Sequence, residues 1–160
     1  MSGAVTVNGT SYTAPVKGDT GYASTFSSLV QALCQAAATV FQFGGASGLS
    51  AGNARYMIPG LAAVSTTEYL VPCPIAGKLS KLYVKSTSAL SGDSCVFVVQ
   101  VDGVASALTC TMANGATAAN DTTHTVSVTA GQTLSVKATA GASYSSGGAN
   151  LVATFLFTPS

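Results

Sequence analysis

Residues Cys95–Cys110 read CVFVVQVDGVASALTC, two largely apolar runs on either side of Asp102-Gly103. An Asp-Gly pair between alternating apolar residues predicts an antiparallel β-hairpin with a two-residue turn. In that register Val101 pairs with Val104. One face of the hairpin is then apolar except for Ser106 and should meet a core; its apolar members are Cys95, Phe97, Val99, Val101, Val104, Leu108 and Cys110.

The same register pairs Cys95 with Cys110, which would place their Cα atoms about 5.5 Å apart, within disulfide range. The N-terminus, Met1-Ser2-Gly3-Ala4, lacks the basic and apolar segments of a secretory signal. We therefore expect a protein made and used without export by that route, and in a reducing cell free thiols are favoured over a disulfide. The disulfide remains the open alternative.

Strand patterns recur on both sides of this hairpin. Leu151, Ala153, Phe155 and Phe157 alternate near the end of the chain, for example. Short strands separated by turn signals predict a β-sandwich, jelly-roll-like, over residues 54–160. The eight expected strands are 54–58, 66–71, 78–86, 94–101, 104–112, 123–128, 133–139 and 149–157.

The stretch from Thr20 to Ala54 contains no charged residue, and its centre, 22–43, has apolar residues at helical spacing. The spacing predicts one α-helix, and two heptad positions form its seam: Phe26, Leu33 and Val40 in one, Leu29, Ala36 and Phe43 in the other. A helix without a charged face is normally buried. Self-association into a small bundle is favoured, with packing on the chain's own β domain and a membrane span as alternatives.

Two further segments complete the expected organisation. Residues 4–13 read AVTVNGTSYT, in which Asn8-Gly9 is a strong turn signal between two short strands. Residues 44–53 read GGASGLSAGN, a composition typical of a linker. The predicted domains are therefore a docking arm with an oligomerisation helix (1–43), a linker (44–53) and a β-sandwich (54–160), a mainly β fold.

Composition excludes some functions. The chain is 48% hydrophobic and 7% charged, with a net charge of +1 and no basic run, so the electrostatic footprint of a nucleic-acid binder is missing. His124 is the sole histidine, and the acids do not cluster in the sequence. We expect no enzyme, no cofactor and no metal site, although a Cys–His nucleophilic pair remains conceivable.

A sugar-binding site would need an aromatic platform with fixed polar groups. The chain has no tryptophan, and the candidate surface aromatics are Tyr56, Tyr69, Tyr83 and Tyr144. Tyr144, between Ser143 and Ser145 in a predicted loop, is the candidate chosen for ligand binding. The alternative is that its ring only anchors that loop.

The chain resembles head fibres and capsid decoration proteins of tailed bacteriophages. The resemblance rests on the leader VTVNGTSY (5–12) with Pro15 and GDTG (18–21), and on the strand segments GKLSKLYV (77–84), VVQVDG (98–103) and VSVTAGQTLSV (126–136). It covers most of the chain. In that group a short β arm leads into a helix, a linker and a small trimeric jelly roll.

The resemblance implies a homotrimeric virion protein, assembled in the host cytoplasm, whose partners are its own copies and a major capsid or other virion protein. Val5, Val7 and Tyr12 would dock on the capsid, and no membrane or nucleic acid is involved. The alternative function is a receptor- or glycan-binding tail fibre on the same scaffold.

Overall fold

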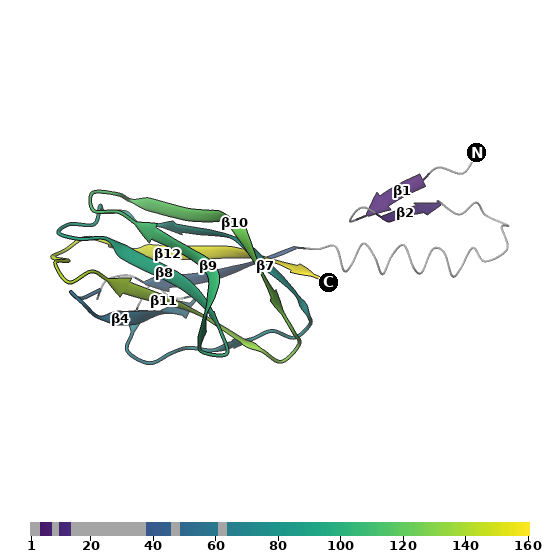
Figure 1. The fold of residues 1–160 in the computed structure, drawn as a ribbon, viewed down its shortest axis with the longest axis horizontal. Helices are drawn as coiled ribbons and strands as arrows, with labels where there is room; N and C mark the ends of the chain where they lie inside the picture. The colour runs from purple at the N-terminus through teal and green to yellow at the C-terminus, as the bar shows by residue number, and fades with distance from the viewer. Residues whose placement is uncertain (1–3, 8–9, 14–37, 46–48, 61–63) are drawn as a thin grey trace.

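The computed structural model describes residues 4–7, 10–13, 38–45, 49–60 and 64–160. All the regular secondary structure in these ranges is β-strand (Figure 1). β1 (Ala4–Val7) and β2 (Thr10–Thr13) form a two-stranded antiparallel sheet in which Val5 pairs with Tyr12. The predicted hairpin over residues 4–13 is therefore confirmed. No helix with the length and apolar character of a membrane span occurs within the described ranges.

The other strands follow one antiparallel path that wraps into a β-sandwich. One layer contains β10 (Ala118–Val128), β7 (Gly77–Lys85), β12 (Leu151–Pro159) and β3 (Thr39–Gly45). The other contains β11 (Thr133–Ala140), β8 (Cys95–Val101) and β9 (Val104–Met112). The predicted jelly-roll-like β-sandwich is confirmed in this general form.

One strand connects the two layers. β4 (Ala54–Pro59) pairs through residues 54–57 with β11 and through residues 58–59 with β3. A strand that passes from one sheet to the other turns the corner of a sandwich. Two short strands, β5 (Val64–Ser65) and β6 (Val71–Pro72), pair with β4 and β11. They replace the single strand that the sequence predicted over 66–71.

The end of the predicted helix is wrong, because residues 39–43 belong to β3. Phe43 is fully buried, and its ring stacks on that of Phe155 in β12 at a centroid distance of 5.7 Å. Phe41 also stacks on Phe155, at 5.5 Å. β-branched and aromatic residues favour the pleated strand when a partner strand is present to pack against them. The rest of the predicted helix, residues 22–37, lies outside the described residues.

β3 also includes part of the predicted linker. Gly44 pairs with Val152 and Gly45 with Leu151, so both glycines lie within the first sheet. Further along, Gly52 donates a backbone hydrogen bond to the carbonyl of Gly141. The described part of residues 44–53 is thus bonded to the sandwich.

The hairpin of β8 and β9 keeps its predicted turn but changes register further out. Val101 pairs with Val104, as expected, yet Phe97 rather than Cys95 pairs with Cys110. The shift lies opposite Val99, whose carbonyl accepts a 2.6 Å hydrogen bond from the Ser106 hydroxyl. Two extra residues on β9 preserve the alternation of faces, so Cys95, Phe97, Val99, Leu108 and Cys110 are buried as predicted. The prediction is wrong for Val104, which is 69% exposed beside the turn, and for the pairing of Cys95 with Cys110.

We predict that Phe43→Ala lowers the free energy of unfolding by about 3–5 kcal/mol, the range for removing a buried phenylalanine. Urea denaturation followed by circular dichroism measures it. The matched control is Val40→Thr on the same strand, because Val40 is 62% exposed and should change stability by no more than about 0.5 kcal/mol. Equal losses at both positions, as a shared helical seam would give, would contradict the assignment of β3.

Candidate functional site

The aspartates of the sandwich hold its loops and strands together. Asp93 accepts hydrogen bonds from the amide of the adjacent Ser94 and from the amide of Ser143, which lies 50 positions further along the chain. Asp102, in the β8–β9 turn, accepts one from the amide of Thr133 at the start of β11. These amide hydrogen bonds lower the pKa of both carboxyls. Both aspartates therefore stabilise the fold in their ionised form.

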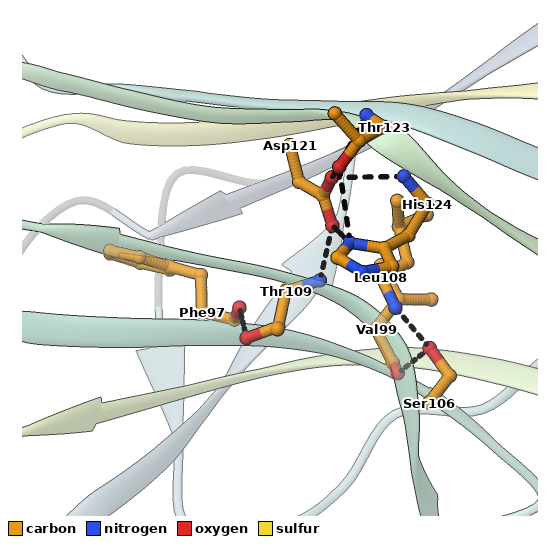
Figure 2. A network of polar contacts seen from close by, with 8 residues as sticks. All are labelled: Phe97, Val99, Ser106, Leu108, Thr109, Asp121, Thr123 and His124. Carbon is orange, nitrogen blue, oxygen red and sulfur yellow. Dashed lines mark hydrogen bonds and ion pairs between the residues drawn. The ribbon is translucent and has the colours of Figure 1, made fainter.

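Asp121 makes the most hydrogen bonds of the described acids (Figure 2). Its Oδ1 accepts from the amides of Thr123 and His124, each at 3.1 Å, and from the Thr123 hydroxyl at 3.0 Å. Its Oδ2 lies 2.8 Å from His124 Nδ1 and accepts a 3.1 Å bond from the Thr109 amide. Asp121 is 6% exposed, so its carboxylate has little contact with water and is instead hydrogen-bonded to donors of the protein.

This carboxylate joins the two ends of the strand path. β9 and β10 stand at opposite ends of the hydrogen-bonded order, and Thr109 and Asp121 lie on these two strands. Burial works to raise the pKa of Asp121, but the hydrogen bonds from His124, Thr109 and Thr123 outweigh it and hold the pKa well below its usual range. An ionised side chain thus links β9 to β10.

Chemistry based on the described cysteines is disfavoured by their surroundings. Cys73, Cys95 and Cys110 are free and buried. Burial raises the pKa of Cys95 to about 12, with a further contribution from Cys110, and burial followed by the charge of Asp121 raises the pKa of Cys110 to about 12. Since the thiolate is the nucleophile, these thiols are inert at neutral pH.

Metal binding has no support within the described ranges, where no three side chains of the His, Cys, Asp and Glu types come together. His124 is exposed, and its Nδ1 is engaged with Asp121. Asp121 and His124 are arranged like the orienting pair of a catalytic triad, but the described cysteines, Cys73, Cys95 and Cys110, are buried and protonated and do not supply it with a nucleophile. The network is therefore best explained as a structural link.

We predict that Asp121→Asn costs about 2–3 kcal/mol of stability at neutral pH, because an amide cannot accept from all these donors and some would stay buried and unpaired. The wild-type carboxyl binds its proton at lower pH when folded than when unfolded. Its contribution is therefore complete above about pH 4 and is lost as pH falls below that value.

Chemical denaturation at a series of pH values tests both statements, and Asp121→Asn should show a weaker fall in stability on acidification. His124→Ala is the control, because the exposed ring should contribute under about 1 kcal/mol. A neutral-pH stability of Asp121→Asn equal to wild type would contradict the structural role of the carboxylate.

The outer face of the first sheet carries a different kind of site. Tyr83 of β7 pairs with Asn120 of β10 on one side and with Thr154 of β12 on the other, and Thr154 pairs in turn with Gln42 of β3. Directly paired residues share a face of a sheet. Four strands therefore present a row of one aromatic and three polar side chains, in which Tyr83 is 49% exposed.

Two open hollows flank Tyr83 and Thr154, and we call them together the Tyr83 trough. The larger, of about 710 Å³, lies toward the loop end of β7 and is lined by Tyr83, Lys85, Ser86, Thr87, Thr117, Asn150, Val152 and Thr154. The smaller, of about 230 Å³, is lined by Val40, Lys81, Tyr83, Thr154, Phe155 and Leu156. An aromatic ring with a few polar groups around it is the usual composition of a small-ligand site.

The structure distributes the predicted site residues unevenly. Val5, Val7 and Tyr12 lie on β1 and β2, but their side chains are not among those described. Val40 is exposed at the trough, whereas Phe43 is in the core and cannot form a subunit seam. The other predicted oligomerisation residues, Phe26, Leu29, Leu33 and Ala36, lie outside the described residues.

The choice of Tyr144 as the ligand-binding aromatic is wrong. Tyr144 is 8% exposed, and its hydroxyl donates a 2.6 Å hydrogen bond to the carbonyl of Gly147. The ring therefore anchors its loop and offers no platform to a ligand. The sequence indicates Tyr83 as a surface aromatic, but Lys81, Lys85 and Thr154 are not predicted as site residues. The alternation in Lys81-Leu82-Tyr83-Val84-Lys85 was the available signal, since it places both lysines and the tyrosine on one face.

No family model matches the chain, and no curated protein matches it. A comparison with solved structures finds a family 35 carbohydrate-binding module from Clostridium thermocellum, in its native form, at a TM-score of 0.37 and 14% identity, covering 77% of this chain and 92% of that one. A likeness of this degree identifies neither a family nor a ligand.

Proposed function

We propose that the chain is a non-enzymatic virion structural protein, a capsid decoration or head-fibre protein that docks through its N-terminal arm and projects the β-sandwich. The supporting observation is that β1 and β2 pair only with each other among the described strands. A two-stranded hairpin is marginal alone and gains stability against another surface. In this proposal that surface belongs to the capsid.

Two other features support the proposal. All the described acids already bond within the fold: Asp93, Asp102 and Asp121 hold backbone amides, and Glu68 accepts a 2.6 Å bond from the Ser135 hydroxyl. Such groups suit a rigid scaffold better than acid–base catalysis.

The uncharged stretch from Thr20 to Ala54 favours association between copies. A homotrimer would present three arms together, and weak arms would gain from effective concentration.

The Tyr83 trough favours a second candidate function, saccharide binding by the projected sandwich. A half-exposed tyrosine flanked by Thr154 and Asn120 offers a ring for stacking on a sugar and polar groups for its hydroxyls. A virion protein with this site would bring the particle to a glycan-coated surface. The two functions are compatible, because one uses the arm and the other the sandwich.

We predict that deletion of residues 1–17 abolishes binding to capsids of the phage that encodes the chain while the sandwich stays folded. Co-sedimentation of purified protein with capsids measures binding, and circular dichroism measures folding. Full-length Tyr83→Ala is the control and should bind capsids like wild type. A truncated protein that still co-sediments would show that the arm is not the docking element.

For the trough, we predict that Tyr83→Ala reduces saccharide binding by about two- to tenfold, since an aromatic contact contributes about 0.5–1.5 kcal/mol. A glycan array identifies bound saccharides, and calorimetry compares the variants. Tyr69→Ala is the matched control, because Tyr69 is also exposed, at 43%, but lines neither hollow. Equal losses in both variants would contradict a site at Tyr83.

A further inference from the structure

The lysines of this protein are concentrated on the strand that crosses the Tyr83 trough. β7 carries Lys78, Lys81 and Lys85, three of the chain's six basic residues. Lys85 lines the larger hollow and Lys81 the smaller one. The ion pair between Asp121 and His124 is the only one found among the described residues, so neither lysine has a described acidic partner.

The nearest acid along the sheet faces the other way. Asp121 is the Cα partner of Leu82, which is buried, and directly paired residues share a face. Its carboxylate is occupied by Thr109 and His124 near the link between β9 and β10. The outer face around Tyr83 therefore has positive charge without a described carboxylate to neutralise it.

The backbone at Lys81 is unusual in the same place. Lys81 has a φ of +56°, a conformation disfavoured for residues that carry a Cβ. Both ladders of β7 are interrupted there: residues 122–124 of β10 stand opposite Lys81, and the pairing with β12 shifts between Thr154 and Leu156. Bulges re-aim a side chain and often occur beside functional sites. A lysine in a backbone conformation that glycine would adopt without strain is consistent with a binding role.

The spacing of these groups indicates what kind of ligand would fit the trough. Lys81 and Lys85 are four residues apart, at most about 13 Å along a strand, and Tyr83 lies midway between them. One positive charge therefore stands in each hollow with an aromatic ring between. Thr87 and Asn150 also line the larger hollow, where the Asn150 amide donates a 3.3 Å hydrogen bond to the Thr87 hydroxyl. An extended oligomer of sugar rings, with an acidic group on successive rings, matches this arrangement.

We propose that the Tyr83 trough binds an anionic oligosaccharide, with one sugar ring on Tyr83 and acidic groups at Lys81 and Lys85. This inference rests on the saccharide-binding function proposed above and specifies its ligand class. It is independent of the arm and of capsid docking.

The test compares two probes of equal length by calorimetry on the full chain: an oligomer of galacturonic acid, and the same oligomer after its carboxyls have been reduced to alcohols. Wild type should prefer the acidic oligomer, and its affinity should fall as salt rises. Lys81→Gln and Lys85→Gln should each weaken acidic binding by about two- to fivefold, as expected for exposed ion pairs. The double variant should lose the preference and most of the salt dependence.

Lys78→Gln is the matched control, because Lys78 is exposed on the same strand but lines neither hollow. Lys81→Gly gives an independent readout: it should keep or raise thermal stability while weakening the acidic oligomer as Lys81→Gln does. A stability loss with unchanged binding would mean that Lys81 serves the fold alone.

Other outcomes overturn the inference in different ways. Equal binding of both probes would leave saccharide binding in place and refute the anionic ligand class. No binding of either would refute the proposed ligand class, whereas saccharide binding itself would fail only if the glycan array also finds no ligand. The capsid co-sedimentation result would stand in both cases. Equally tight binding of single-stranded DNA would show a general polyanion surface. A change of oligomeric state in Tyr83→Ala, seen by native mass spectrometry, would show that this face contacts a second copy.

Discussion

The packing of Phe43 against Phe155 is the contact on which the sandwich depends. It brings β3 beside β12, and β3 then gives β4 an edge to pair with as it crosses from one layer to the other. Without β3, the outer edge of β12 would lose its partner and the aromatic rings would face water. Burial of two phenylalanines on neighbouring strands therefore helps complete the first sheet and fixes where the β-sandwich begins in the chain.

A sandwich closed in this way can display a rigid face. Asp93, Asp102 and Asp121 each link segments that are distant along the chain or in the strand order, and they do so as ionised acceptors of amide hydrogen bonds. These groups stiffen loops and the link between β9 and β10 without lining the trough. Tyr83 and its polar neighbours then sit on paired strands, where side-chain positions are better defined than on loops.

Much of the sandwich could be predicted from the sequence because alternation and turn residues are local signals, as in Leu151–Phe157 and at Asp102-Gly103. The register near Ser106 could not, because two inserted residues leave the alternation of inward and outward side chains unchanged. The sequence TVFQF (39–43) fits helical spacing through Val40 and Phe43 and strand alternation through Phe41 and Phe43 equally well. Only Phe155, more than a hundred residues later, decides between them.

The trough was hidden for the same reason, since it combines β7 and β12 with loops far apart in sequence. The most direct test of the account is NMR of the full chain, measuring the carbon chemical shifts of residues 39–45 and the proton contacts of the Phe43 ring. We expect strand-type shifts and close contacts between the rings of Phe43 and Phe155. Helical shifts through Phe43, with no contact to Phe155, would contradict it.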